Sequence, residues 1–184
     1  MTSFSFWHEV ILERKKRTMA QTNPTNYLKG LSVLAVDDEK DILDTIEDVL
    51  DVAKIDRAED FDTASQKLKD TKYDLAILDI MGVNGLELLV QTVNQGIPTV
   101  MLTAHAVNPE SLKASINKGA LAYLPKEELT RLDDLVNELL EAHKKGNSTW
   151  RLLFEKLGDS YAKSFGPEWA KDDPEFWKYY GYMI

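Results

Sequence analysis

The sequence predicts an α/β protein in which a doubly wound, five-stranded parallel sheet is covered by five helices. From Leu31 onward, short aliphatic or β-branched runs alternate with longer stretches in which apolar residues recur at helical spacing. Most of the short runs are predominantly apolar, as is typical of strands that are buried on both faces of a parallel sheet. We therefore expect one domain at residues 31–145, followed by a short helical extension.

Each element is predicted by a local pattern, and no long structureless loop is needed between the elements. The strands are expected at residues 31–36, 55–58, 73–78, 97–102 and 120–124. The helices are expected at residues 41–52, 62–68, 85–96, 109–119 and 128–144. One face of the first helix is apolar and the other carries Asp and Glu, so this helix can cover the sheet. Asn108 and Pro109 suit the N-cap and the first turn of the fourth helix, and Gly119 suits its end.

The composition excludes several classes of protein. The chain has 184 residues and no Cys, which rules out disulfides, zinc–thiolate sites and thiol catalysis and is typical of a cytoplasmic protein. No apolar run reaches the roughly 18 residues that a membrane-spanning helix needs. The formal net charge of -9 argues against direct DNA binding, which requires a basic surface.

Three carboxylates lie where two of the predicted strands end. Asp37 and Asp38 follow the first strand, and Asp79 follows the third. The carboxyl ends of parallel strands meet at one edge of the sheet, where ligands bind in folds of this class. Like charges in a partly desolvated cleft raise one another's pKa unless a divalent cation lies among them. The cluster therefore predicts a metal site, and Mg²⁺ suits an all-oxygen ligand set.

A hydroxyl and an ammonium are expected at the same edge, because Thr103 ends the fourth strand and Lys126 follows the fifth. A carboxylate oxygen can attack phosphorus, while a metal, Lys126 and the Thr103 hydroxyl stabilise the charge on the phosphoryl oxygens. Taken singly, such residues are typical of solvated turns, helix caps and strand ends. Their joint placement favours a site that forms an aspartyl phosphate.

Four motifs, in this order, resemble the receiver domain of bacterial two-component response regulators over residues 31–145. They are Val36-Asp37-Asp38-Glu39, Leu78-Asp79-Ile80-Met81, Thr103-Ala104 and Tyr123-Leu124-Pro125-Lys126. The resemblance implies a flavodoxin-like receiver fold with Asp79 as the phosphoacceptor. It also implies a Mg²⁺ ion bound by Asp38, Asp79 and the Met81 backbone carbonyl, with Asp37 acting through water.

The resemblance further implies roles for the ends of the last two strands. Thr103 and Lys126 would bind the phosphoryl group. Thr103 would move toward that group while Tyr123 turns inward, and this switch would repack the face made by the fourth helix, fifth strand and fifth helix.

The sequence departs from the family pattern at two places. The loop after Asp79 is two residues shorter than usual, and we expect Gly82 and Gly85 to permit the tight turns that it needs. Glu127 replaces the proline that normally follows the family's lysine, and we expect a trans peptide bond before it. The resemblance implies that the phosphoryl lifetime is tuned at the positions of Met81 and His105. Because the apolar Met81 cannot orient an attacking water, we expect slow self-dephosphorylation.

The two ends of the chain lie outside the expected domain. Residues 1–30 are expected to be a disordered tail, and the alternative is a short basic amphipathic helix that binds a membrane surface or a partner. Residues 146–184 hold most of the aromatic residues and are expected to form helices at 148–157 and 167–180. This extension is too short and too acidic for a DNA-binding effector. It is either a strap packed back on the receiver or an exposed surface for docking or homodimerisation.

The sequence therefore predicts a single-receiver response regulator. It would accept a phosphoryl group from a sensor histidine kinase or a histidine phosphotransfer protein and signal through contacts with a downstream protein. It would not be an enzyme beyond its own phosphoryl transfer and slow dephosphorylation. The alternative is a phosphorylation-independent scaffold that acts through its aromatic extension.

Overall fold

The computed structural model describes residues 25–104, 109–166 and 168–182. Its strands are β1 (Ser32–Val36), β2 (Lys54–Ala58), β3 (Leu75–Asp79), β4 (Thr99–Thr103) and β5 (Ala122–Pro125). Its helices are α2 (Lys40–Val49), α3 (Phe61–Asp70), α4 (Gly85–Asn94), α5 (Pro109–Asn117), the 3₁₀ helix η1 (Lys126–Arg131), α6 (Leu132–Lys144), α7 (Thr149–Phe165) and α8 (Pro174–Tyr179). The predicted alternation of strands and helices is confirmed.

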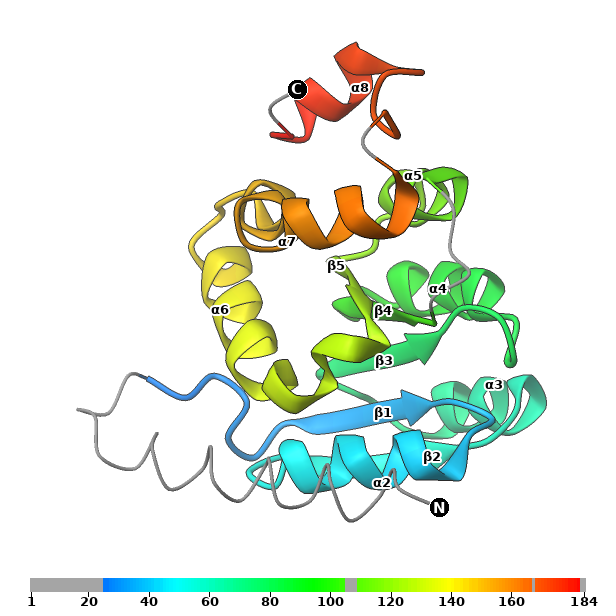
Figure 1. Ribbon diagram of the computed structural model, residues 1–184. Helices are drawn as coiled ribbons and strands as arrows, with labels where there is room; N and C mark the ends of the chain where they lie inside the picture. The colour runs from blue at the N-terminus through cyan, green and yellow to red at the C-terminus, as the bar shows by residue number, and fades with distance from the viewer. Residues whose placement is uncertain (1–24, 105–108, 167, 183–184) are drawn as a thin grey trace.

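The five strands form one parallel sheet in the order β2-β1-β3-β4-β5 (Figure 1). The chain reverses its direction of winding between β1 and β3, and in folds of this class ligands bind at the carboxyl ends of the strands beside such a reversal. Strands β3 and β4 are buried along their whole length, which agrees with their apolar sequences. The register places Asp79 opposite Leu102, so the ends of β3 and β4 lie side by side.

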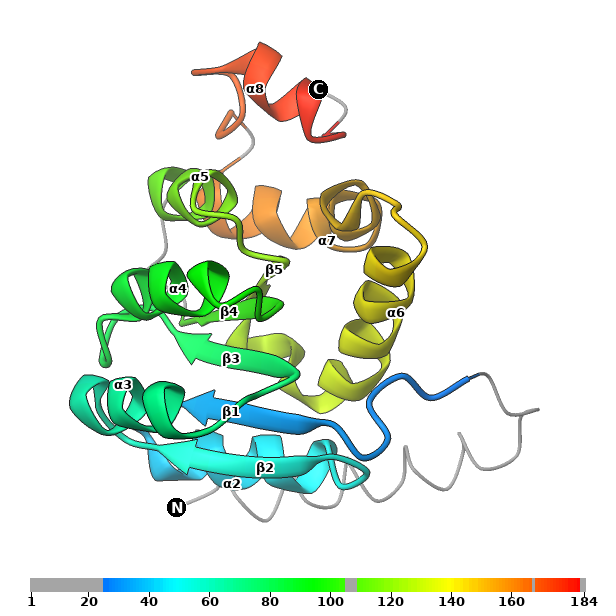
Figure 2. The ribbon, with the colours of Figure 1, turned by 180° about the vertical axis from the view of Figure 1, so that it is seen from behind.

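Helices cover both faces of the sheet, and the two faces carry different helices. Helices α2 and α6 pack together on one face, whereas α3, α4 and α5 pack in a row on the other (Figures 1 and 2). The apolar side of α2 buries Leu43, Ile46 and Val49, as its helical spacing predicts. Burial of these aliphatic side chains between helix and strand builds the core on each face.

The segment expected as one helix over residues 128–144 is divided in two. The 3₁₀ helix η1 begins at Lys126, directly after β5, and the α-helical hydrogen bonding of α6 begins only at Leu132. A 3₁₀ turn is tighter than an α-helical turn and is common where a helix starts. Lys126 is therefore part of the turn that leaves the sheet edge.

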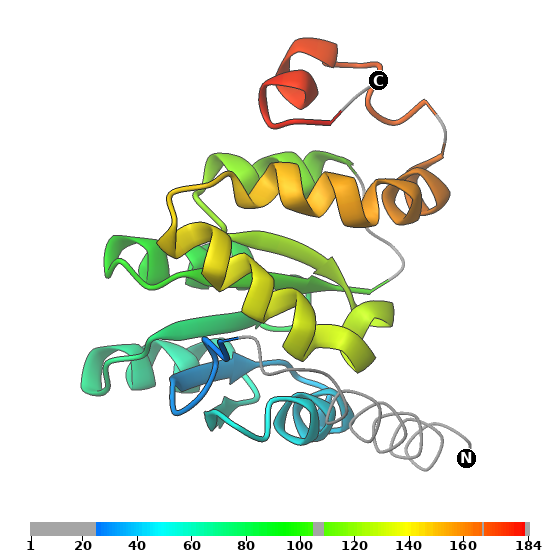
Figure 3. The ribbon, with the colours of Figure 1, turned by 90° about the vertical axis from the view of Figure 1, so that its left-hand side faces the viewer.

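The aromatic extension is helical and packs back on the domain, as the first of its two interpretations predicted. Helix α7 begins after Ser148, whose hydroxyl accepts a hydrogen bond from the Arg151 amide at 3.2 Å, and it extends well beyond the expected end at residue 157. Helix α7 lies across the β5 edge of the sheet and contacts α6. Helix α8 lies on the side of α7 that faces away from the sheet (Figure 3). The expected start of the second helix near Pro167 is wrong. Helix α8 begins at Pro174, where Asp173 caps it by accepting from the Phe176 amide at 3.3 Å.

The residues just before β1 belong to the core, although we expected a disordered tail up to residue 30. Leu28 is buried, and the Tyr27 amide donates to the Asn137 side chain of α6 at 2.6 Å. The alternative helix near the N-terminus lies outside the described residues. Within the described ranges, no helix combines the length and the apolar character that crossing a membrane requires.

Candidate functional site

The predicted site residues come from four strands, and the structure brings several of them together at the carboxyl edge of the sheet. Asp37 follows β1, Asp79 ends β3, Thr103 ends β4 and Lys126 follows β5. The Lys126 ammonium is the centre of the group. It contacts carboxylate oxygens of both Asp37 and Asp79, which are far apart in the sequence but close at this edge.

The two carboxylate oxygens of Asp79 have different environments. Oδ2 accepts hydrogen bonds from the amides of Met81 and Gly82 at 3.0 and 2.8 Å. Oδ1 lies 3.0 Å from Lys126 Nζ. The loop after β3 therefore fixes the orientation of the carboxylate through Oδ2, and Lys126 supplies positive charge at Oδ1.

Lys126 is largely buried and is held by three carboxylates. Its Nζ lies 2.8 Å from Asp37 Oδ2, 2.9 Å from Glu39 Oε1 and 3.0 Å from Asp79 Oδ1. Burial alone would lower the pKa of this ammonium, but the attraction of the carboxylates of Asp37, Glu39 and Asp79 outweighs burial and raises the pKa above its usual range. Lys126 is thus a permanent cation at the site.

Glu39 also forms an ion pair with Lys126, and we did not predict a role for Glu39 from the sequence. Its side chain is mostly exposed, and it reaches Lys126 across 87 positions of the chain. The only sequence signal was its place directly after the two aspartates. Nothing local indicated that its carboxylate would turn toward the end of β5.

Asp37 is fully buried and carries the clearest electrostatic perturbation. Its Oδ1 accepts from the Glu39 amide at 3.0 Å. Lys126 Nζ forms an ion pair with Oδ2 at 2.8 Å, and Oδ2 has no hydrogen-bond partner among the described residues. Burial raises the pKa of Asp37 to about 6, and the nearby Lys126 ammonium only partly opposes this rise.

Asp38 is exposed and lies against the loop that follows Asp79. A Cβ placed on Gly82 would come within 1.9 Å of Asp38 Oδ1, so the lack of a side chain at Gly82 is what lets this carboxylate approach. A Cβ on Gly85 would likewise come within 1.9 Å of the Asp79 carbonyl. We expected these glycines to permit tight turns, but the residue with positive φ in this loop is Asn84, at 53°. The two glycines instead let neighbouring atoms come close to the backbone, where a side chain would collide with them.

Thr103 and Tyr123 are neighbours of the charged group and not part of it. Thr103 is buried at the end of β4 and donates to the Ala104 carbonyl at 3.2 Å. The Tyr123 ring is fully buried, and its hydroxyl lies 3.0 Å from that of Ser111 on α5. Burial raises the pKa of Tyr123, and hydrogen bonds to Ser111 and Thr103 oppose the rise. The predicted switch pair is therefore in contact.

The described peptide bonds are all trans, which confirms the expectation for Lys126–Glu127. Met81, the predicted donor of a carbonyl ligand, has a side chain that is 81% exposed beside Asp79. His105 lies outside the described residues.

The carboxylates are not gathered into a ready metal site. Within residues 25–104, 109–166 and 168–182, no group of three or more carboxylate or imidazole side chains is arranged to hold a metal ion. Lys126 lies between Asp37 and Asp79 and neutralises part of their charge. The donor set nevertheless fits a hard cation, because Asp37 Oδ2 lacks a hydrogen bond and Asp38 is an exposed carboxylate beside the loop.

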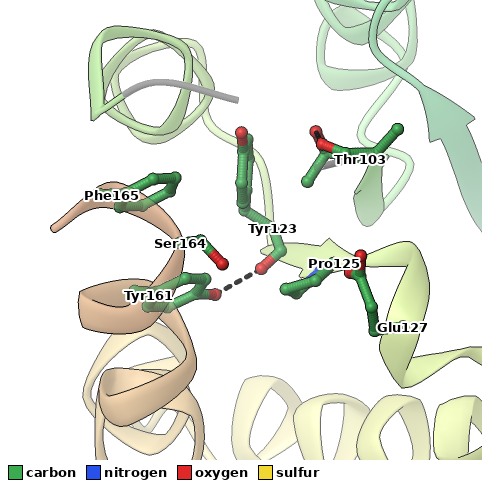
Figure 4. A pocket seen from close by; sticks show the side chains of 8 residues that line it. Thr103, Tyr123, Pro125, Glu127, Tyr161, Ser164 and Phe165 are labelled. Carbon is green, nitrogen blue, oxygen red and sulfur yellow. Dashed lines mark hydrogen bonds between the residues drawn. The ribbon is translucent and has the colours of Figure 1, made fainter. Parts of the chain in front are cut away.

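The C-terminal extension also contacts β5, the strand that leads to Lys126. The Tyr161 hydroxyl of α7 donates to the Tyr123 carbonyl at 2.5 Å (Figure 4). We predicted the aromatic extension but could not predict this contact, because 38 positions separate the two tyrosines and the partner is a backbone atom.

Comparison with known proteins agrees with this geometry. The model of the response regulator receiver domain family matches residues 33–139. No curated protein matches the chain. The crystal structure of NtrX from Brucella abortus is 30% identical, with a TM-score of 0.57, and the match covers 64% of this chain but only 28% of that one.

Two solved receiver domains match over nearly their full length. A CheY-like receiver domain protein from Methanospirillum hungatei is 26% identical, with a TM-score of 0.56, over 64% of this chain and 99% of that one. The isolated receiver domain of Brucella abortus NtrX is 32% identical, with a TM-score of 0.53, over 59% of this chain and 98% of that one. The family match ends before the aromatic extension, which begins at residue 146.

Proposed function

The chain belongs to the response regulator receiver domain family, and we propose that it accepts a phosphoryl group on Asp79. The donor would be the phosphohistidine of a sensor histidine kinase or of a histidine phosphotransfer protein. The observation that carries this proposal is the asymmetric environment of the Asp79 carboxylate. One oxygen is held by two backbone amides, and the other faces a permanent cation at 3.0 Å.

The chemical step is a direct transfer between two nucleophiles. A carboxylate oxygen of Asp79 forms a bond to phosphorus while the phosphorus–nitrogen bond of the donor histidine breaks. The bonding electrons leave with the imidazole nitrogen. Lys126 stabilises the negative charge on the phosphoryl oxygens, and the Thr103 hydroxyl, at the neighbouring strand end, donates a hydrogen bond to one of them.

Mg²⁺ is the cofactor that this donor set fits. Asp38, Asp79 and the Met81 backbone carbonyl would hold it, and Asp37 would act through a bound water. When bound, the cation supplies charge neutralisation for the phosphoryl oxygens. Lys126 already neutralises part of the negative charge of Asp37 and Asp79, and a bound cation would neutralise more of it.

The output would be protein contact in the cytoplasm, without DNA binding and without enzymatic activity beyond the protein's own phosphoryl transfer and hydrolysis. Hydrolysis would be slow. The Met81 side chain is 81% exposed beside the acceptor and offers no group that could orient a water for attack.

Incubation with acetyl phosphate and Mg²⁺, followed by intact mass spectrometry, tests the proposal. We expect one phosphoryl adduct on the wild type and none on Asp79→Asn, which preserves the size of the side chain. Asp62→Asn, an exposed position on α3, is the matched control and should be phosphorylated normally. An absent wild-type adduct would favour the phosphorylation-independent scaffold instead, and an adduct that survives Asp79→Asn would exclude Asp79 as the acceptor.

A further inference from the structure

The face of the sheet around β5 is occupied by the chain's own C-terminal segment. Helix α7 lies along the outer edge of β5, and its Thr149 hydroxyl donates to the Leu121 carbonyl at 2.8 Å. An ion pair of 2.7 Å between Lys156 and Glu138 joins α7 to α6. An exposed edge strand is a ready template for pairing with another chain, so this cover also protects β5.

The extension is also joined to α5, on the other side of β5. Lys113 of α5 forms an ion pair with Asp173, the cap of α8. The same ammonium lies 4.6 Å from the centre of the Phe176 ring. The extension thus spans the whole face that α5, β5 and α6 form.

A cluster of aromatic rings holds α7, α8 and the turn between them together. Phe154 is central to this cluster, because its ring contacts those of Tyr161, Trp169 and Trp177. Trp169 and Trp177 pack edge to face with their centroids 4.7 Å apart. Aromatic pairs of this kind stabilise beyond the area that they bury. The cluster makes the extension one packed unit.

This unit reaches the interior of the receiver through Tyr161. Its hydroxyl donates to the Tyr123 carbonyl at 2.5 Å, and its ring lies edge-on to the Tyr123 ring at 6.4 Å. A small cavity of about 10 Å³ separates the end of α7 from the site, and its lining includes Thr103, Tyr123, Ser164 and Phe165 (Figure 4). That volume is room for about one water molecule. Thr103 and residues on the inner side of α7 therefore line the same cavity.

We propose that the extension is a docked segment whose hold on the α5–β5–α6 face weakens when Asp79 carries a phosphoryl group. The inference rests on the proposed function, because the trigger is the group on Asp79. When the Thr103 hydroxyl turns to that group, Thr103 withdraws from the cavity and from the Tyr123 hydroxyl. The cavity then grows, and α7 loses packing on its inner side.

One unfavourable interaction in the docked state lowers the free energy that is needed to release the extension. The indole N–H of Trp169 is buried and has no hydrogen-bond partner among the described residues. An unpaired buried donor opposes docking, and solvent would satisfy it on release. Tyr179, by contrast, is 82% exposed in the docked state, so not all of the aromatic surface depends on docking.

The tryptophans make the test direct. Trp150, Trp169 and Trp177 are all buried in the extension, and the fourth tryptophan, Trp7, can be replaced by Phe to remove its background. The Trp7→Phe protein is phosphorylated with acetyl phosphate and Mg²⁺, and the extent is read by intact mass. We expect a red shift of tryptophan emission and faster amide hydrogen exchange across α7, in proportion to the phosphorylated fraction.

The outcomes separate this inference from the proposed function. A protein that is phosphorylated by mass but keeps its emission and its α7 protection, or becomes more protected, overturns the inference and leaves the proposed function standing. A protein that forms no adduct overturns both.

A pair of variants tests the coupling in the reverse direction. By linkage, weaker docking of α7 must favour the phosphorylated state by the same factor. Tyr161→Phe removes only the hydroxyl. Beryllofluoride with Mg²⁺ is a reversible stand-in for the phosphoryl group. We expect the variant to bind it about fivefold more tightly, because about fivefold in affinity corresponds to one typical hydrogen bond. Tyr179→Phe removes an exposed hydroxyl from the same extension and should bind as the wild type does. Equal affinity in the two variants would contradict the coupling.

Discussion

Replacing Asp37 by Asn should stabilise the protein at neutral pH in the absence of Mg²⁺. Asp37 is fully buried, and its pKa in the folded protein is about 6, against 3.8 for an unperturbed carboxyl. The folded protein therefore holds this proton more tightly than the unfolded chain does. The stabilisation by protonated Asp37 is complete below about pH 4 and is lost as the pH rises through about 6.

The size of the effect follows from the difference between the two pKa values. About two pKa units correspond to roughly 3 kcal/mol, which is the most that the ionised carboxylate can cost the folded state at pH 7.5. Asn keeps an oxygen that can accept from the Glu39 amide and is never ionised. We expect Asp37→Asn to gain up to about 3 kcal/mol at pH 7.5 and almost nothing at pH 4, and for a chain of this size this gain raises the Tm by up to about 10 °C.

Urea unfolding at pH 4, 6 and 7.5 in EDTA, followed by tryptophan fluorescence, measures this difference. The difference in unfolding free energy between the two proteins reports the effect of the charge on Asp37. Asp38→Asn, at the exposed neighbouring position, is the control and should not reproduce the gain at pH 7.5, because it removes no buried carboxylate. The reasoning fails if the gain from Asp37→Asn is the same at pH 4 and pH 7.5, or if the wild type is the more stable protein at pH 7.5.

The remaining predictions concern the charged group and the loop beside it. Mg²⁺ should raise the Tm of the wild type more than that of Asp37→Asn, because only the wild type holds the buried carboxylate of Asp37 beside that of Asp79; equal shifts in a thermal melt would argue against it. Lys126→Gln should slow phosphorylation by acetyl phosphate about 10²- to 10³-fold, measured by intact mass, since it removes the ammonium at Asp79 Oδ1. Gly82→Ala should weaken Mg²⁺ binding by at least about tenfold in calorimetry, because a Cβ would displace Asp38, and an unchanged affinity would exclude a role for that contact. Met81→Asn should shorten the phosphoryl lifetime several-fold, because an amide can orient water and a thioether cannot.

Local patterns were sufficient to predict the fold because each element carries its own signal. The strand β3 is apolar at every position before Asp79, and α2 has one apolar stripe, so their type and approximate bounds follow from the sequence. The end of α7 and the start of α8 were less predictable. Two prolines, Pro167 and Pro174, each suit the first turn of a helix, and the choice depended on the Asp173 cap and on packing against α7.

The site was predictable to the extent that strand ends are predictable. Parallel strands bring their carboxyl ends to one edge, so Asp37, Asp79 and Lys126 had to lie near one another. Their contacts were not predictable. The approach of Glu39 to Lys126, and of Asp38 to the α-carbon of Gly82, depend on side-chain directions and loop paths that have no periodic signature.

The sequence by itself determined the parallel α/β architecture, the positions of Asp37, Asp79 and Lys126 at strand ends, and the presence of an aromatic extension. These follow from hydrophobic periodicity and from the identity of residues at the ends of apolar runs, which are local properties of the chain. Only the tertiary structure decided that Lys126 lies between Asp37 and Asp79, that Glu39 completes its shell, and that Tyr161 joins the extension to the carbonyl of Tyr123. The physical reason is that these are long-range contacts between charged or polar atoms, and their partners are chosen by how the packed elements meet.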